Sequence, residues 1–84
     1  MRIFLSKHAQ KRMRERNISS KQVRAVIVQP DAIATDQTQT QRRIAKKLCR
    51  QHAKECLLLV IYEMRNKDIH VITVISTSKI EKYL

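Results

Sequence analysis

Two apolar runs in the second half of the chain constrain the fold more than any other feature of the sequence. Residues 55–64 read ECLLLVIYEM and residues 69–76 read IHVITVIS, with the polar stretch RNKD between them. The first run is apolar at successive positions, which is typical of a central strand buried on both faces. The second run is rich in β-branched residues, and the short polar connection predicts an antiparallel hairpin. In a chain of 84 residues, such a hairpin must form much of the core.

The first thirty residues have the pattern of two short helices in tandem. Ser6 is a suitable N-cap for a helix over residues 7–16, and Asn17 is a typical C-terminal breaker. Ser19 and Gln22 have the spacing of a capping box, which predicts the start of a second helix. Its apolar face consists of Val23, Val26 and Ile27, and Pro30 ends it.

The remaining segments predict further strands and a last helix. Residues 32–34 are a weak strand candidate, and residues 42–49 mix apolar and basic positions as edge strands do. Ser78 and Glu81 again have a capping-box spacing, which opens a short C-terminal helix. Residues 2–5 are either a strand or a lead-in. We therefore expect one α+β domain over residues 1–84, with two N-terminal helices packed on a four-stranded antiparallel sheet.

The charge distribution points to an anionic partner. The formal net charge is +11, and residues 1–30 hold eight Lys and Arg against one acid, whereas residues 57–84 hold four against three. A basic excess concentrated in one segment is expected when one face meets a polyanion. The alternatives are nucleic acid, an anionic membrane, an acidic protein, or simply a solvated basic surface.

The first predicted helix carries the candidate site. On a helical wheel with 100° per residue, His8, Arg12 and Arg16 form a ridge on one shoulder of the stripe marked by Ala9 and Met13. RNA cleavage without metal needs a base for the 2′-hydroxyl, an acid for the leaving oxygen and cations for the phosphate. Histidine suits the first two tasks and arginine the third. The alternative is that the arginines pair with Glu63, Glu81 or backbone carbonyls and that His8 merely caps a groove.

A second group of residues is expected to extend RNA binding beyond that ridge. Arg43 and Lys47 alternate onto one face of the predicted edge strand, where they either lengthen the basic groove or only keep the edge soluble. Ser78 and Lys79 follow the last strand, where backbone N–H groups can bind an anion or simply cap the helix. The predicted RNA-binding residues are Lys11, Arg43, Lys47, Ser78 and Lys79.

The two cysteines and the lack of a long apolar segment bear on cofactor and location. Cys49 and Cys56 are expected to be thiols in a reducing cytoplasm, although they could bridge within one hairpin. With His52 they have the spacing C-x₂-H-x₃-C, which offers three zinc ligands but no fourth nearby in the sequence. A hairpin turn explains the spacing equally well, so no metal and no cofactor are expected. No apolar run has the length of a signal peptide or a membrane span, which predicts a cytoplasmic protein without membrane contact.

The N-terminal motif resembles that of a known family. The stretch HAQKRMRERNISSKQVRAVIVQP is similar to the opening of domain-of-unknown-function family 4258, and the tail VITVISTSKIEKYL resembles tails in one branch of it. The positions that carry the resemblance are His8, Ala9, Arg12, Met13, Arg16, Ile18, Val23 and Pro30. Such proteins are similar in layout to the RelE and BrnT toxins. The resemblance implies an α+β fold of the type shared by barnase, EndoU, colicin and RelE.

The resemblance also implies a function. It predicts the toxin of a type II toxin–antitoxin pair, an endoribonuclease held in check by a small acidic antitoxin. Tyr83 is then a fourth catalytic candidate beside His8, Arg12 and Arg16, because terminal aromatic residues act in acid–base work in RelE-like toxins; a hydrophobic anchor is the alternative. Stacking side chains are scarce, which favours backbone recognition or binding within a ribosome. A non-catalytic nucleic-acid-binding module and a subunit that pairs with an acidic protein remain alternatives.

Overall fold

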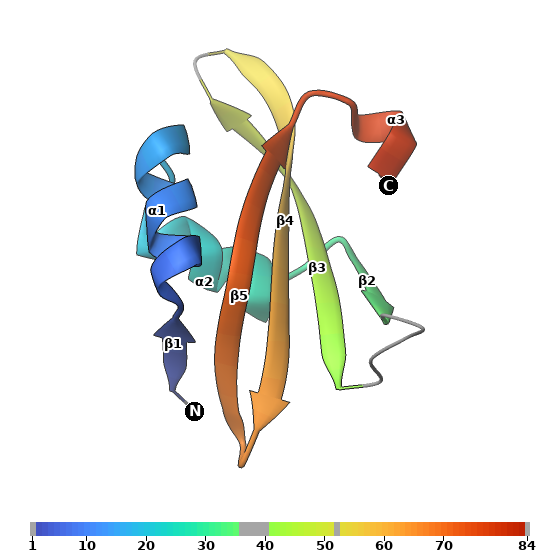
Figure 1. Cartoon of the computed structure of the whole chain (residues 1–84). Coiled ribbons are helices and arrows are strands. Elements are labelled where there is room, and N and C mark those ends of the chain that lie inside the picture. Colours follow the sequence, from blue (N-terminus) through green and yellow to red (C-terminus); the bar gives the residue numbers. More distant parts are fainter. Residues whose placement is uncertain (1, 36–40, 52, 84) are drawn as a thin grey trace.

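The computed structural model describes residues 2–35, 41–51 and 53–83. Over these residues the chain is an α+β domain with a five-stranded mixed sheet and three helices (Figure 1). The strands lie in the order β1-β5-β4-β3-β2. In chain order the elements are β1 (Ile3–Leu5), α1 (Lys7–Arg16), α2 (Ser20–Val28), β2 (Ala32–Thr35), β3 (Arg42–Gln51), β4 (Lys54–Arg65), β5 (Asp68–Thr77) and α3 (Ile80–Tyr83).

The predicted hairpin of the two apolar runs is confirmed. β4 and β5 pair antiparallel from Arg65↔Asp68 to Leu57↔Thr77. The connection consists of Asn66 and Lys67, which both have positive φ angles, 51° and 70°. A two-residue turn with both residues in this region matches the right-handed twist of the flanking strands. Asn66 tolerates this conformation better than most residues, which fits a sequence that has no glycine.

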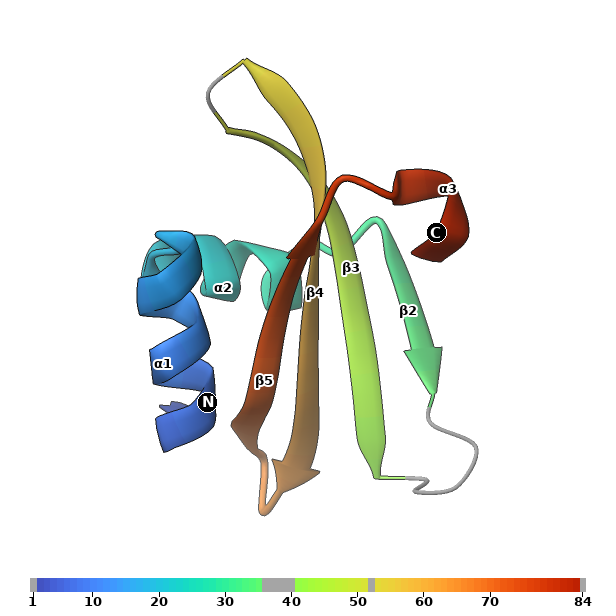
Figure 2. The same cartoon turned by 45° about the horizontal axis from the view of Figure 1, so that its top comes forward.

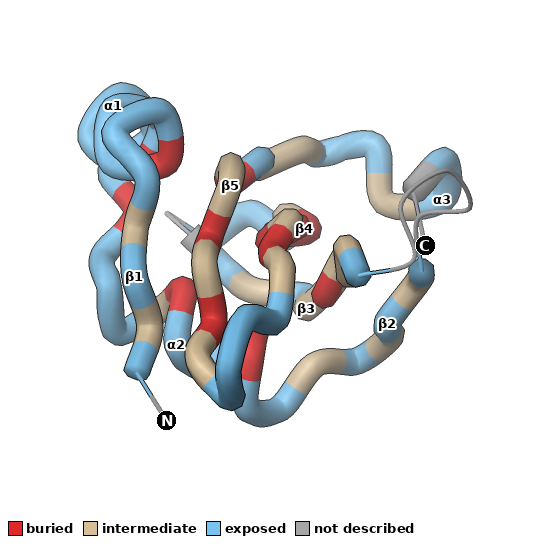
Figure 3. Tube along the Cα trace, turned by 60° about the horizontal axis from the view of Figure 1, so that its bottom comes forward, coloured by how far each residue is buried: buried red, intermediate tan, exposed pale blue. Residues whose placement is uncertain are grey.

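The core is centred on β4, the middle strand of the sheet. Leu57, Leu58, Leu59 and Val60 are all buried, so this strand is covered on both faces as its composition predicts. Leu58 and Val60 belong to a cluster with the buried residues of both long helices, whereas Leu57 and Leu59 alternate to the opposite face. Figure 3 shows buried positions on α1, α2, β4 and β5, the elements that surround the core. The helix residues of the cluster are Ala9, Met13, Val23, Val26 and Ile27.

The helix boundaries follow the capping signals of the sequence. The Ser6 side chain accepts a hydrogen bond from the Ala9 backbone N–H, 2.9 Å away, and Asn17 ends α1 in the left-handed region with a φ of 57°. At α2, both hydrogen bonds of the Ser19–Gln22 capping box are present. Both views of the cartoon place α1 beside β5, with α2 running behind the sheet (Figure 2). No helix within the described ranges is long and apolar enough to cross a bilayer.

The prediction of a four-stranded, all-antiparallel sheet is wrong. Residues Ile3–Leu5 form a fifth strand that runs parallel to β5, in the register Ile3↔Ile69 and Leu5↔Val71. The Ile69 N–H donates to the Arg2 carbonyl at 2.8 Å, and the Ser6 N–H donates to the Val71 carbonyl at 3.1 Å. Three residues are too few to show a periodic strand pattern, and their partner lies at the far end of the sequence.

The prediction that residues 42–49 form an edge strand is also wrong. β3 lies between β4 and β2, and β2 pairs with it antiparallel from Ala32↔Lys46 to Thr35↔Arg43. The short strand Ala32–Thr35 therefore takes the edge position. Basic residues are nevertheless compatible with an inner strand here, because long cationic side chains cover apolar surface while their charged ends reach solvent.

Candidate functional site

An open groove with two histidines lies where β1, α1 and β5 meet. It has a volume of about 420 Å³, and its lining includes His8 from α1, His70 from β5 and Arg65 from the end of β4. We call it the histidine groove. Its full lining is Phe4, Leu5, Ser6, His8, Arg65, His70, Val71 and Ile72.

His70 is held by a ring contact from the neighbouring strand. The register of β1 and β5 places Phe4 opposite His70, and the two rings stack with their centroids 4.9 Å apart and their planes 16° from parallel. Phe4 is 43% exposed, so the stack lies at the surface of the groove and not in the core. The stack fixes the plane of the imidazole, while its edge nitrogens remain available for hydrogen bonding.

His8 is positioned by an irregularity in β5. Between Ile61↔Thr73 and Tyr62↔Val71 the register of β4 and β5 shifts, which leaves Ile72 as an extra residue. The Ile72 carbonyl accepts a hydrogen bond from the Ser6 hydroxyl at 2.7 Å. The same hydroxyl oxygen caps α1, so one side chain fixes the start of the helix to the bulge of β5. His8 follows two residues later, in the first turn of α1.

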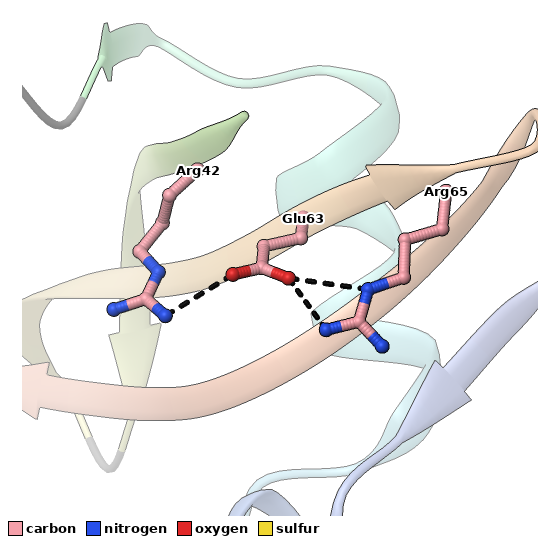
Figure 4. A network of polar contacts seen from close by, with 3 residues as sticks. All are labelled: Arg42, Glu63 and Arg65. Carbon is pink, nitrogen blue, oxygen red and sulfur yellow. Dashed lines mark hydrogen bonds and ion pairs between the residues drawn. The ribbon is translucent and has the colours of Figure 1, made fainter. Parts of the chain in front are cut away.

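Arg65 is oriented by a pair of ionic contacts with Glu63. Arg65 donates from Nε and from its terminal nitrogen to Glu63 Oε2, at 3.2 and 2.7 Å, and Arg42 donates to Glu63 Oε1 at 3.1 Å (Figure 4). These contacts with Arg65, and then with Arg42, lower the pKa of Glu63 below its ordinary value. Glu63 is therefore a carboxylate at neutral pH, and it holds the guanidinium of Arg65, a residue that lines the histidine groove.

The three predicted residues of α1 lie on the surface. His8, Arg12 and Arg16 are all exposed along the helix, while Ala9 and Met13 are buried beneath it. We call these three residues the α1 ridge. Glu63, one of the carboxylates that the sequence offered as an alternative partner for the arginines, is bound to Arg42 and Arg65 instead. The ridge is thus open to a ligand along its length.

A second groove lies at the other end of the α1 ridge. It has a volume of about 550 Å³ and combines Arg16 with residues from the start of β4 and the end of β5. We call it the basic groove, because three of its side chains are the cations Arg16, Lys54 and Lys79. The other lining residues are Glu55, Cys56, Ser76, Thr77 and Ser78. Arg16 therefore links the α1 ridge to a surface that offers hydroxyl groups and positive charge.

The comparison with protein-family models decides the family of this chain. The model described as "Domain of unknown function (DUF4258)" matches residues 5–83. The chain belongs to the DUF4258 family. No curated protein and no solved structure matches it significantly. The match covers both grooves of this DUF4258 domain almost completely, with Phe4 the one lining residue outside it.

The structure of the DUF4258 domain brings some of the predicted site residues together. Arg16, Ser78 and Lys79 line the basic groove, and His8 lines the histidine groove at the opposite end of α1. Lys11 is exposed on α1 beside the ridge.

Other predicted residues lie apart from both grooves. Arg43 and Lys47 are half-buried on the face of β3 that also carries the core residue Ala45. The Lys47 Nζ donates to the carbonyl of Gln29, the C-cap of α2, at 2.8 Å. Tyr83 ends α3, and its side chain lies outside the described part of the chain. His52, considered with the cysteines as a zinc ligand, also lies outside the described residues.

Sequence reasoning missed His70, Arg65 and Phe4 as members of the same groove as His8. The alternation of IHVITVIS places His70 on one face of a strand, but it does not say which helix or strand lies next to that face. That information resides in the parallel pairing of β1 with β5. The stack of Phe4 on His70 would have followed directly from that register.

Proposed function

We propose that this DUF4258 domain binds RNA along the α1 ridge and cleaves it in the histidine groove without a metal ion. The observation that carries the proposal is the convergence of His8, His70 and Arg65 on one open groove, at one end of a basic helix. Two histidines supply a base and an acid near neutral pH, and a guanidinium matches two oxygens of a phosphate.

The proposed reaction uses the 2′-hydroxyl of the RNA as the nucleophile. One histidine takes the proton of this hydroxyl as its oxygen attacks phosphorus, and the other gives a proton to the departing 5′ oxygen. The positive charge of Arg65 stabilises the negative charge that grows on the phosphate oxygens. Glu63 holds the Arg65 guanidinium in position before the reaction begins. The products are a 2′,3′-cyclic phosphate and a free 5′-hydroxyl.

The α1 ridge and the basic groove then hold the flanking RNA. Arg12 and Arg16 continue from His8 along the exposed side of α1, and Lys79 adds positive charge beyond Arg16. Contacts of this kind bind the phosphate backbone without reading its sequence. We further propose that the domain has the layout of the RelE and BrnT toxins and acts as the toxin of a type II toxin–antitoxin pair. The partner is then a small acidic antitoxin whose carboxylates cover this basic surface.

Cleavage is tested with purified protein and a short RNA in the presence of EDTA. We expect His8→Ala and His70→Phe each to lower the cleavage rate about 100-fold or more, the usual loss when an acid or a base is removed. The phenylalanine keeps a ring to stack on Phe4, so the loss does not reflect a missing stack. Lys7→Ala, at an exposed position of the same helix turn, is the control and should keep nearly full activity. A 2′-deoxy substitution at the scissile nucleotide should abolish cleavage.

Binding is tested by the salt dependence of the RNA affinity. Each phosphate contact with a single strand contributes about 0.7 to the slope of log affinity against log salt. Arg12→Ala should therefore reduce the slope by about 0.7, whereas Arg14→Ala, at a position off the ridge on the same helix, should leave it unchanged. Equal effects of the two variants would contradict a role of the ridge.

A nucleic-acid-binding module without catalysis is the second candidate. The observation that favours it is the α1 ridge itself, which is exposed along its length and needs no chemistry to bind phosphates. Intact RNA after long incubation, together with salt-dependent binding, would select this candidate over the nuclease. An affinity that does not change with salt would exclude both. Growth arrest on expression, relieved by His8→Ala, would support the toxin role.

A further inference from the structure

The two cysteines of the chain face each other across two strands. Cys49 on β3 and Cys56 on β4 are directly opposed in the antiparallel register, so their side chains share one face of the sheet. Their sulfur atoms are 2.6 Å apart, and both residues are thiols. A disulfide bond measures about 2.05 Å, so only a small movement separates this pair from a covalent bond.

The surroundings of the two thiols differ. Cys49 packs against the core cluster. Its burial, followed by its hydrogen bond with Cys56 and the charge of that neighbour, raises the pKa of Cys49 to about 12. Cys49 is therefore protonated at neutral pH and reacts slowly on its own, because only a thiolate attacks a disulfide.

Both cysteines are half-buried, but Cys56 is the one that lines a groove. It shares the lining of the basic groove with three cations, Arg16, Lys54 and Lys79, and one carboxylate, Glu55, so the groove carries a net positive charge. A positively charged groove draws in anions, and the small disulfides of cells, such as glutathione disulfide, carry carboxylates. The end of the β3–β4 hairpin also projects beyond the rest of the sheet, away from α2 (Figure 2).

We propose that Cys49 and Cys56 form a thiol–disulfide modification site that takes an anionic low-molecular-weight disulfide such as glutathione disulfide. Cys56 loses its proton and attacks one sulfur of the disulfide, which forms a mixed disulfide and releases one thiol. Cys49 then gives up its proton and attacks the Cys56 sulfur, which releases the second thiol. Two protein thiols are oxidised to one cross-strand bond, and one small disulfide is reduced to two thiols.

The bond joins β3 to β4 next to the basic groove, so oxidation alters a surface that already holds three cations. This inference does not depend on RNA cleavage, since neither cysteine has a part in the proposed reaction. Its test contains no RNA, and its outcome is therefore separate from the outcome of the nuclease tests.

The reduced full-length protein is incubated with glutathione disulfide, and its thiols and intact mass are followed with time. We expect both thiols to disappear together, with a mass two hydrogens below that of the reduced monomer, and dithiothreitol to reverse the change. Three results would each overturn the proposal. These are two stable glutathione adducts, a disulfide-linked dimer, and thiols that stay unchanged at an excess of glutathione disulfide that oxidises a small dithiol.

Two variants test the order of attack. Cys49→Ser should accumulate one glutathione on Cys56, because no second thiol resolves the mixed disulfide. Cys56→Ser should leave Cys49 at least about tenfold less reactive than Cys56 is in the first variant. Equal reactivity of the two single thiols in the native state would contradict the assigned roles. Unfolding in urea should abolish the difference in reactivity between the two single thiols, because the fold causes that difference. The result for the wild-type protein does not depend on the stability of either variant.

Discussion

The hydroxyl of Ser6 is expected to stabilise the protein through two bonds at once, and Ser6→Ala removes both. It accepts from the Ala9 N–H at 2.9 Å as the N-cap of α1, and it donates to the Ile72 carbonyl at 2.7 Å. Loss of an N-cap costs about 1 kcal/mol, and loss of a net hydrogen bond costs about 1 kcal/mol more. We therefore expect the free energy of unfolding to fall by about 2 kcal/mol, which lowers Tm by about 10 °C in a domain of this size.

The matched control is the N-cap of the other long helix. Ser19 caps α2 by accepting from the Gln22 N–H at 3.1 Å, but it has no bond to the sheet. Ser19→Ala should therefore cost only about 1 kcal/mol. Ser6→Thr keeps a hydroxyl at the first position and should recover most of the loss. Urea unfolding followed by far-ultraviolet circular dichroism measures all three.

The difference between the two alanine variants isolates the bond from α1 to the bulge of β5. If Ser6→Ala and Ser19→Ala lower the free energy of unfolding by the same amount, the contact with Ile72 contributes nothing and the reasoning is refuted. If the contact does hold α1 against β5, Ser6→Ala should also lower RNA cleavage, because it releases the helix turn that carries His8. Ser19→Ala should not, since α2 takes no part in the histidine groove.

Two further predictions concern the sheet. The pKa of Glu63 is lowered by Arg65 and Arg42, so its carboxylate stabilises the fold above the unfolded pKa of about 4.3 and loses that effect as the pH falls through the folded pKa. Glu63→Gln should therefore flatten the acid limb of the urea midpoint plotted against pH, and an unchanged limb would argue against the ion pairs. In the core, Leu58 is 1% exposed, and Leu58→Ala should lower the free energy of unfolding, measured in urea, by about 3 kcal/mol. Leu48 is 42% exposed, and Leu48→Ala should lower the free energy of unfolding by less than about 1 kcal/mol. Similar losses of stability at both positions would contradict the assignment of the core.

The parts of the fold that were predictable are those whose signals are local in sequence. Ser6 and Asn17 mark the two ends of α1, and the Ser19–Gln22 box marks the start of α2, because capping depends on residues three positions apart. The β4–β5 hairpin was also predictable, since an apolar run and a β-branched run flank the short polar stretch RNKD. For residues 2–5 the sequence left a strand and a lead-in open, and it did not predict the pairing with β5. Ile3–Leu5 is too short for a periodic signal, and its partner is more than 60 positions away, as the 66-position separation of Ser6 and Ile72 illustrates.

The candidate site divides along the same line. The α1 ridge was predictable from the helical period, and the structure leaves all three of its residues exposed. His70 lines the same groove as His8 because of the parallel register of β1 with β5 and the bulge at Ile72. No local sequence pattern predicts either of these features. Arg43 and Lys47 were predicted on the assumption of an edge strand. β2 takes that edge, and Lys47 instead donates to the carbonyl of Gln29, the C-cap of α2.

The pairing of β1 with β5 determines when the two strands can assemble during translation. β1 and α1 leave the ribosome early, but the strand that receives them is made some 66 residues later, judged by the link between Ser6 and Ile72. At typical rates of synthesis this delay is about 3 to 13 seconds. A nascent chain that stops before residue 68 lacks β5 and with it the His70 side of the histidine groove. The histidine groove therefore forms only after β5 has been synthesised.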